Sequence, residues 1–232
     1  MKKKFLSYIL LLSVFVLTAS CDKDENNAYP YGGHDFVDLG LPSGLKWATM
    51  NVGASVMIQA GNFYAWGETE TKQMYNFVDY KYCSETNADS TLKTLSKYVI
   101  ECESGSWGNI DNITQLDDGD DVARQLWGDG WRMPTWAEMN ELLEICNHAN
   151  ETVNGVSGTR FIGPNGNSIF LPWAGTMYNG ELEYPARAYY WTSTLNADDC
   201  RYGEGLFLSA KFCMRGNGFF RCSGRLVRPV HD

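Results

Sequence analysis

The chain has 232 residues and a formal net charge of −9 at neutral pH, with 44% hydrophobic and 20% charged residues. This composition is typical of a globular protein, and the length suits one domain that follows a leader. The acidic balance argues against nucleic acid as a partner, because a polyanion repels a negatively charged protein.

The first 21 residues have the layout of a secretory leader. Lys2–Lys4 precede an apolar stretch at residues 5–17, and small residues stand directly before Cys21. The apolar stretch is shorter than the ~20 residues that a membrane-spanning helix requires. The pattern predicts that residues 1–20 are a cleaved signal peptide. The segment resembles a bacterial lipobox, and this resemblance implies that Cys21 is lipidated and becomes the mature N-terminus.

Residues 21–33 are expected to form an acidic tether. Residues 22–27 are charged or polar and contain no core-forming side chain, which indicates a solvated linker. They also resemble the export signals that follow the lipidated cysteine in Bacteroides-type surface lipoproteins. That resemblance implies an outer-membrane lipoprotein exposed at the cell surface, and a plain linker is the alternative. The globular domain is expected over residues 34–232.

The first half of the domain is predicted to contain short strands and one long loop. Residues 36–39 and 45–49 read as two strands around a Pro-Ser-Gly turn, and residues 62–66 read as a third strand that ends at Gly67. Residues 68–116 are polar with scattered aromatic side chains and predict an irregular loop. A loop of this length is unusual in a compact domain and is often functional.

Two helices follow the loop. The acidic residues Asp117, Asp118, Asp120 and Asp121 suit the start of a helix over residues 122–127, because their charges complement the helix dipole. Calcium binding by this cluster is the alternative, although its spacing differs from an EF-hand loop. Thr135 and Glu138 form a capping box that opens a second helix. Its apolar stripe is formed by Met139, Leu142, Leu143 and Cys146.

The second half returns to strands. Residues 160–162 and 168–171 flank Asn165-Gly166, which is a hairpin signal. Residues 189–193, 205–209 and 226–230 also read as strands. Early strands, then two helices, then several strands predict an α+β fold with a mostly antiparallel sheet and long irregular loops.

The candidate catalytic and redox residues give weak patterns. Six cysteines follow Cys21, and the most plausible disulfide joins Cys83 to Cys102, whereas Cys146 is expected to be a buried thiol. The three histidines belong to no catalytic motif. We expect His148 at the end of the second helix, and the other two, His34 and His231, at exposed positions. No cofactor and no metal are predicted, and we expect no calcium requirement.

Six segments in order carry a resemblance to a known family. They are Val37-Asp38-Leu39-Gly40-Leu41-Pro42-Ser43-Gly44, Trp47-Ala48-Thr49, Tyr64-Ala65-Trp66-Gly67-Glu68, Trp131-Arg132-Met133-Pro134-Thr135, Tyr190-Trp191-Thr192-Ser193 and Val227-Arg228-Pro229-Val230. Together they resemble the Fibrobacter succinogenes major paralogous domain over residues 34–230. The resemblance implies a C-type-lectin-like fold. Some members are diversified by retroelements in their C-terminal strands and loops, and use the fold as a binding scaffold.

Two departures narrow what the resemblance implies. The Glu-Pro-Asn, Gln-Pro-Asp and Trp-Asn-Asp triplets of calcium-dependent lectins do not occur, so calcium-mediated sugar binding is not implied. Cys213 and Cys222 lie near the position of the cysteine pair of formylglycine-generating enzymes, but without that family's flanking pattern. A catalytic role is therefore not expected.

The C-terminal segment has the composition of a recognition surface, because aromatic rings and guanidinium groups stand between glycines. The sequence predicts an exposed face that contacts a protein or glycan ligand and is formed by Tyr202, Arg215, Asn217, Phe219, Phe220, Ser223 and Arg225. The alternative is that these aromatics are core residues of a final hairpin. Phe207, Phe212 and Met214 are expected in the core. An enzyme acting on polysaccharide and a structural or adhesive subunit are the alternative functions.

Overall fold

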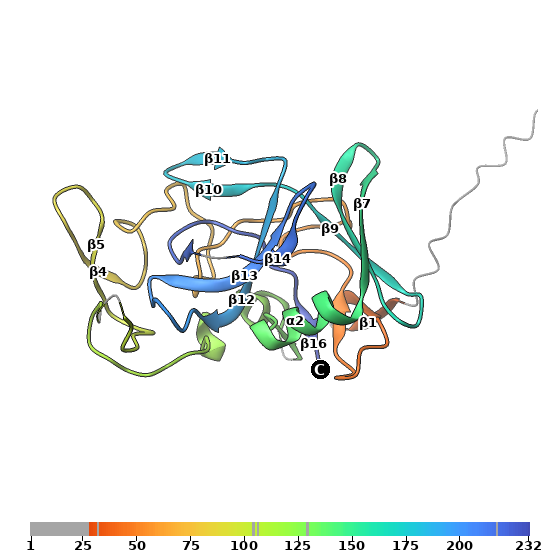
Figure 1. Ribbon diagram of the computed structural model, residues 1–232, viewed down its shortest axis with the longest axis horizontal. Coiled ribbons are helices and arrows are strands. Elements are labelled where there is room, and N and C mark those ends of the chain that lie inside the picture. The colour runs from red at the N-terminus through yellow and green to blue at the C-terminus, as the bar shows by residue number, and fades with distance from the viewer. Residues whose placement is uncertain (1–27, 32, 104, 106, 129, 217) are drawn as a thin grey trace, which may run out of the picture.

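The computed structural model describes residues 28–232 except 32, 104, 106, 129 and 217 (Figure 1). The predicted signal peptide, Cys21, most of the predicted tether and Asn217 therefore lie outside the described residues. The helices are α1, Val122–Trp127, and α2, Trp136–Ile145, and a 3-10 turn η1 covers Asp118–Asp120.

Sixteen strands are present in the described part of the chain. In the first half these are β1 Ala28–Tyr31, β2 His34–Asp38, β3 Lys46–Ala48, β4 Cys83–Thr86, β5 Leu92–Leu95 and β6 Trp131–Arg132. In the second half they are β7 Asn147–Val153, β8 Val156–Ile162, β9 Ser168–Pro172, β10 Thr176–Tyr178, β11 Glu181–Glu183, β12 Ala188–Leu195, β13 Tyr202–Leu208, β14 Cys213–Arg215, β15 Phe219–Phe220 and β16 Val230–His231.

Every pairing between these strands is antiparallel. One sheet has the order β1-β2-β3-β16-β6, a second is β7-β8-β9, and a third joins β12, β13 and β14, with β15 also paired to β13. The β4–β5 and β10–β11 hairpins stand apart. In Figure 1 the β4–β5 hairpin lies at one end of the elongated molecule and the β7–β9 sheet lies near the other. The predicted α+β class with mostly antiparallel strands is confirmed.

Strand β12 divides the core into two clusters. Successive side chains of a strand point to opposite faces, so Tyr189 and Trp191 pack into one cluster while Ala188 and Tyr190 pack into the other. All four are buried. A strand that is buried on both faces is a central element, and β12 therefore fixes the position of the segments that pack on either side.

The long segment 68–116 is mostly irregular, as predicted, but it is not loosely attached. Its aromatic side chains Tyr75, Phe77, Tyr80 and Tyr82 are buried in the first core cluster. Arg221, which is fully buried, also binds this segment: its guanidinium donates to the Tyr80 hydroxyl at 2.9 Å and to two of the segment's backbone carbonyl oxygens. The scattered aromatics of the sequence are thus the core of an ordered loop.

Both predicted helix starts are confirmed. The Asp121 side chain accepts hydrogen bonds from the backbone N–H groups of Ala123 and Arg124 and caps α1. Asp120 accepts from Lys81 Nζ at 2.8 Å and from Lys97 Nζ at 2.7 Å. Burial alone would raise the pKa of Asp120, but these hydrogen bonds outweigh burial and lower it. Both of these carboxylates therefore have structural partners.

Helix α2 begins with the predicted capping box. The Thr135 hydroxyl accepts from the Glu138 backbone N–H at 3.3 Å, and the Glu138 carboxylate accepts from the Thr135 backbone N–H at 2.7 Å. Replacing Thr135 by alanine is expected to lower the free energy of unfolding by ~1 kcal/mol, because one N-terminal N–H group of the helix loses its acceptor. Chemical denaturation measures this change, and an unchanged midpoint would contradict the contribution of the cap.

The structure differs from the predicted elements at three places. Residues 62–66 form no strand, and only Tyr64 makes a bridge, to Arg225. Residues 226–230 run buried through the core, but only the last of them belongs to a strand, β16. The strand β7 was not expected, because most of its residues are polar and exposed, so the alternation of a half-buried strand is lacking.

The described cysteines are all free thiols, so the expected disulfide between Cys83 and Cys102 is not formed. Cys102 lies beside Cys200 instead, whose backbone N–H donates to the Cys102 sulfur at 3.3 Å. Cys146 is buried at the end of the apolar face of α2, as predicted. Burial raises its pKa to about 11, which makes it a poor nucleophile at neutral pH.

Among the described residues, neither helix has the length and apolar character that crossing a bilayer demands.

Candidate ligand-binding face

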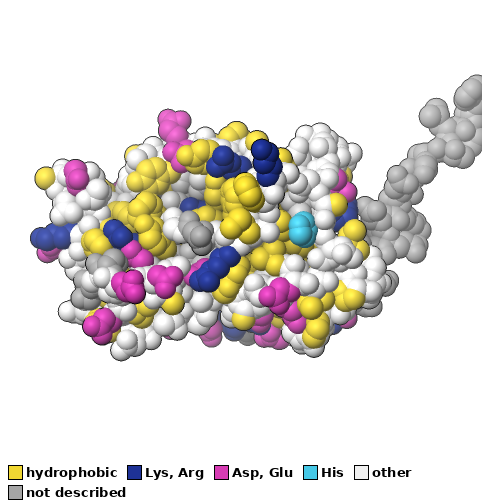
Figure 2. Space-filling view, in the orientation of Figure 1, with side chains coloured by type: hydrophobic (Ala, Val, Ile, Leu, Met, Phe, Trp, Pro, Cys, Tyr) yellow, Lys and Arg dark blue, Asp and Glu magenta, His cyan; other side chains and the backbone are white. Residues whose placement is uncertain are grey.

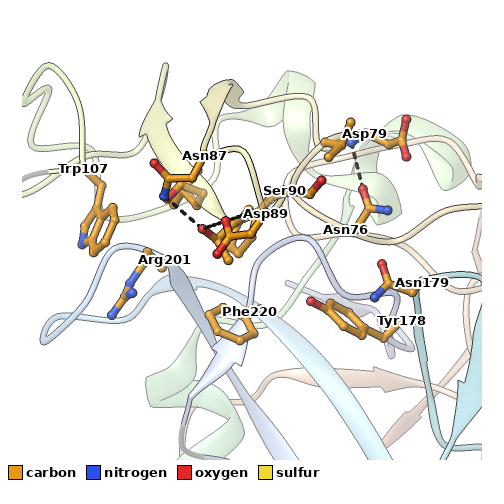
Figure 3. Close-up of a pocket in the computed structure, with 14 residues that line it drawn as sticks. Asn76, Asp79, Asn87, Asp89, Ser90, Trp107, Tyr178, Asn179, Arg201 and Phe220 are labelled. Carbon is orange, nitrogen blue, oxygen red and sulfur yellow. Dashed lines mark hydrogen bonds between the residues drawn. The ribbon is translucent and has the colours of Figure 1, made fainter.

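A hollow of about 660 Å³ lies between the turn of the β4–β5 hairpin, residues 76–79, the end of β10 and strand β15. We call it the aromatic groove, because four aromatic side chains line it: Phe77, Trp107, Tyr178 and Phe220. In Figure 3 Trp107 and Arg201 lie at one end of the groove, Tyr178 and Asn179 lie at the other, and Phe220 lies between them.

Aromatic contacts hold the groove in shape. Phe220 packs edge-on against Phe77, with ring centroids 5.4 Å apart, and in a tilted arrangement against Tyr202, with ring centroids 4.9 Å apart. The Arg201 guanidinium lies 4.2 Å from the centre of the Trp107 ring. It is also paired with Asp199, whose carboxylate accepts from Arg201 Nε at 3.0 Å. Packing therefore holds the groove in shape before a ligand binds, so binding costs less conformational entropy.

Polar side chains form the opposite wall. The Asp89 carboxylate accepts from the Thr91 hydroxyl at 2.6 Å, and the Asn87 side-chain amide donates to the same hydroxyl at 2.9 Å. Asn76 and Asn179 add two further amide groups. Hydrogen bonds from Thr91 lower the pKa of Asp89, so this carboxylate is ionised at neutral pH. The wall thus offers donors and acceptors opposite apolar rings.

A second hollow of about 410 Å³ adjoins the groove. Tyr178 and Phe220 border both hollows, and Phe219, Ser223 and Arg225 border only the second. We call it the Arg225 hollow. Because two side chains are shared, a ligand of moderate size can contact both at once.

Arg225 is a buried cation without a charged partner. Only 6% of the residue is exposed, and its Nε and Nη1 atoms have no hydrogen-bond partner. The guanidinium lies 3.7 Å from the ring centre of Phe219 and 4.8 Å from those of Tyr189 and Trp191. Burial lowers its pKa to about 9, so the group still carries its charge at pH 7.

A third hollow of about 470 Å³ lies on the other side of Phe219 and is bordered by β13 and β14. Two of its apolar side chains are well exposed, Phe212 by 55% and Met214 by 43%. The expectation that these two residues lie in the core is therefore wrong, and Phe207 is only partly buried. Figure 2 shows hydrophobic side chains in several patches across this side of the molecule, with basic side chains between them.

Asn217 is not described, and the other predicted ligand-binding residues lie on or near β13, β14 and β15, but not all of them are exposed. Tyr202 and Phe220 are half-buried, and Phe220 lines the aromatic groove. Arg215 is exposed, but its Nε donates to the buried carboxylate of Glu204 at 2.6 Å, and its guanidinium lies over Trp136. Most of these residues therefore already have partners within the chain.

Three of the predicted contact residues are buried, so the expectation of one continuous exposed face is wrong for them. Phe219 is 5% exposed, because Gly205 and Gly216 leave room for its ring beside Tyr189 and Trp191. Ser223 and Arg225 lie on the chain as it enters the core. They reach a ligand only through the hollow that they border.

The histidines do not form a catalytic group with the groove. His148 lies in β7, not at the end of α2, and packs on Phe161 with ring centroids 5.8 Å apart. His34 is stacked on Trp127 at 3.8 Å, and His231 on Phe36 at 5.4 Å, so neither is the freely exposed residue that was expected. Within residues 28–232, leaving aside the five undescribed positions and the side chains of β1, no group of three or more His, Cys, Asp or Glu side chains could hold a metal ion.

Comparison of the chain with protein-family models, with curated proteins and with solved structures finds no match. The resemblance to the major paralogous domain, and the C-type-lectin-like fold that it implies, therefore remain predictions.

The sequence pointed to one side of the aromatic groove and missed the other. Phe220 was predicted as a contact residue from the composition of the C-terminal segment. Trp107, Asn87 and Asp89 belong to the long segment that was expected to be irregular. The sequence feature that could have pointed to these residues is the length of the loop, because a loop of this length is often functional. Which of its aromatics face the core and which face solvent depends on packing.

Proposed function

We propose that the chain is an outer-membrane lipoprotein, anchored through Cys21, that displays a C-type-lectin-like binding domain at the cell surface. The domain binds a glycan in the aromatic groove and has no catalytic activity. The lipobox-like leader and the acidic tether support the anchoring, and mass spectrometry of the mature N-terminus tests it. A diacylated or triacylated Cys21 is expected, and an unmodified N-terminus at another residue would exclude lipidation.

The observation that carries the binding function is the chemistry of the groove walls. A sugar ring has apolar C–H faces and an edge of hydroxyl groups. Trp107, Tyr178 and Phe220 offer flat apolar surface, and the amide and carboxylate groups of Asn87 and Asp89 lie across the groove from Phe220. The volume of about 660 Å³ is within the range of small-ligand sites.

Two carboxylates line the groove, Asp79 and Asp89, and the state of Asp89 favours binding over catalysis. A general acid needs a raised pKa, whereas hydrogen bonds from Thr91 lower that of Asp89. The alternative of a polysaccharide-cleaving enzyme therefore has no support from this carboxylate.

Glycan-array screening of the full chain in detergent, followed by titration calorimetry, tests the proposal. Replacing Trp107 or Phe220 by alanine is expected to weaken binding of the selected oligosaccharide about tenfold each, because one aromatic contact contributes ~0.5–1.5 kcal/mol beyond its buried area. Phe212→Ala is the matched control, since this exposed ring lies outside the groove. Unchanged affinity in both groove variants would refute a glycan site in the aromatic groove.

A protein ligand is the second candidate, and the third hollow favours it. Exposed Phe212 and Met214 next to Arg187 and Arg215 are the residue types found at the centres of protein interfaces. In that case Phe212→Ala would abolish binding, whereas the Trp107 variant would bind normally.

A further inference from the structure

The three buried arginines among the described residues differ in how their charge is satisfied. Arg221 and Arg228 are both fully buried, and each guanidinium donates to several oxygens of the chain. Arg228 binds the Asn51 side chain at 2.8 Å and the backbone carbonyls of Ala48 and Phe170 at 2.9 and 2.8 Å. Arg225 is as deeply placed, yet two of its nitrogens have no acceptor.

An unsatisfied buried cation is costly, because it has lost water without gaining a partner. The backbone of Arg225 is fixed by a pair of hydrogen bonds with Tyr64, each 2.9 Å long. Its side chain is held over the ring of Phe219. The guanidinium is therefore held by packing, and no described residue accepts a hydrogen bond from its buried Nε and Nη1 atoms.

The Arg225 hollow is where such an acceptor can enter. Arg225 and the buried Ser223 border it, together with the hydroxyl-bearing Tyr178 and Tyr184. Glu183 also borders the hollow, but it does not accept a hydrogen bond from Arg225 Nε or Nη1. A guanidinium is a fork of N–H donors that fits the two oxygens of a carboxylate or a sulfate.

We propose that the Arg225 hollow binds the anionic group of an acidic sugar, with the guanidinium of Arg225 and the hydroxyl of Ser223 as donors. This inference rests on the proposed function, because the neighbouring sugar units would occupy the aromatic groove. Tyr178 and Phe220 border both hollows, so an oligosaccharide can place its charged unit on Arg225 and its next unit on the aromatic rings. The ligand class is then an acidic glycan, carboxylated or sulfated.

The test compares matched oligosaccharides on the full chain in detergent: an oligogalacturonate, its methyl ester, and a sulfated galactan oligosaccharide of the same length. The wild-type protein is expected to bind at least one anionic oligosaccharide tenfold or more tightly than the neutral ester, since a hydrogen bond to a charged group contributes a factor of this order. Preference for the carboxylated or for the sulfated arm identifies the anion. Equal affinity for the ester and both anionic arms would overturn the proposal.

The variants Arg225→Met and Ser223→Ala probe the two donors. Arg225→Met is expected to abolish the preference for the anion while the neutral ester binds as before, and Ser223→Ala is expected to reduce the preference about threefold. Lys211→Met, which replaces an exposed cation outside the Arg225 hollow, is the control and should keep the preference. If Arg225→Met does not fold, Ser223→Ala and the greater rise in Tm of the wild-type protein with the anionic ligand decide the question.

The two proposals fail in different ways. In one outcome the neutral ester binds, Trp107→Ala weakens this binding, and the charge of the oligosaccharide has no effect on affinity. The groove is then a glycan site, and the role proposed for Arg225 is wrong. If no oligosaccharide binds but an acidic peptide does, and Arg225→Met abolishes this binding, then both the glycan site and the acidic-sugar assignment are wrong.

Discussion

Replacing Arg221 by methionine is expected to lower the free energy of unfolding by ~3–5 kcal/mol and largely to unfold the domain. The Arg221 guanidinium satisfies the Tyr80 hydroxyl and the carbonyl oxygens of Lys97, Tyr98 and Cys200 at 2.9–3.0 Å. Each buried acceptor that loses its partner costs ~1–3 kcal/mol. The variant no longer has to bury a charge, but this gain offsets only part of the total cost.

Urea denaturation followed by tryptophan fluorescence measures the effect of Arg221→Met. The exposed Arg187 is the matched control, and Arg187→Met should change the unfolding free energy by less than ~0.5 kcal/mol. The segment 68–116 should become the first site of proteolysis in the Arg221 variant, because this arginine binds it to the C-terminal chain. A variant as stable as the wild type would show that the segment is held by its aromatic side chains alone.

Replacing Phe219 by alanine is expected to cost ~3–5 kcal/mol, which is the usual range for removing a buried phenylalanine ring. The ring packs against Tyr189 and Trp191 in the first core cluster and lies under the guanidinium of Arg225. Its loss would leave a cavity and would also remove one of the surfaces that hold Arg225.

Thermal denaturation tests this expectation and separates Phe219 from its neighbour. Phe220→Ala should cost less than Phe219→Ala, because Phe220 is only half-buried, yet it should impair glycan binding. Phe212→Ala serves as the exposed control and should leave Tm nearly unchanged. Equal, small losses for Phe219 and Phe220 would mean that both rings are contact residues, as the sequence alone suggested.

The elements that could be predicted from the sequence are those encoded by local signals. The capping box at Thr135 and Glu138 is formed by residues three apart, so a single turn of chain contains its physical cause. The hairpin was indicated by Asn165-Gly166, although residues 163–167 connect its strands and the Asn165 side chain also donates to the distant Asp38 carbonyl. Strand β12 was also predictable, because its β-branched and aromatic residues favour a buried strand.

The candidate site could be predicted only in part, because it depends on distant packing. Phe219 and Phe220 are adjacent and chemically identical, yet one is buried and the other lines the groove. The difference arises because Gly205 and Gly216 make room for one ring. Nor does the local sequence distinguish Arg225 from Arg221 and Arg228, since the acceptors of the latter two come from remote segments such as residues 48–51 and 97–98.

The route of residues 221–230 through the molecule governs the order in which the chain can fold. This run is buried throughout, it lies against both core clusters, and its backbone bonds to residues as far away as Val52 and Tyr64. Residues 221–230 follow in the sequence every segment that they bond to. The core therefore cannot close until this run has been synthesised, and contacts of such long sequence separation form slowly.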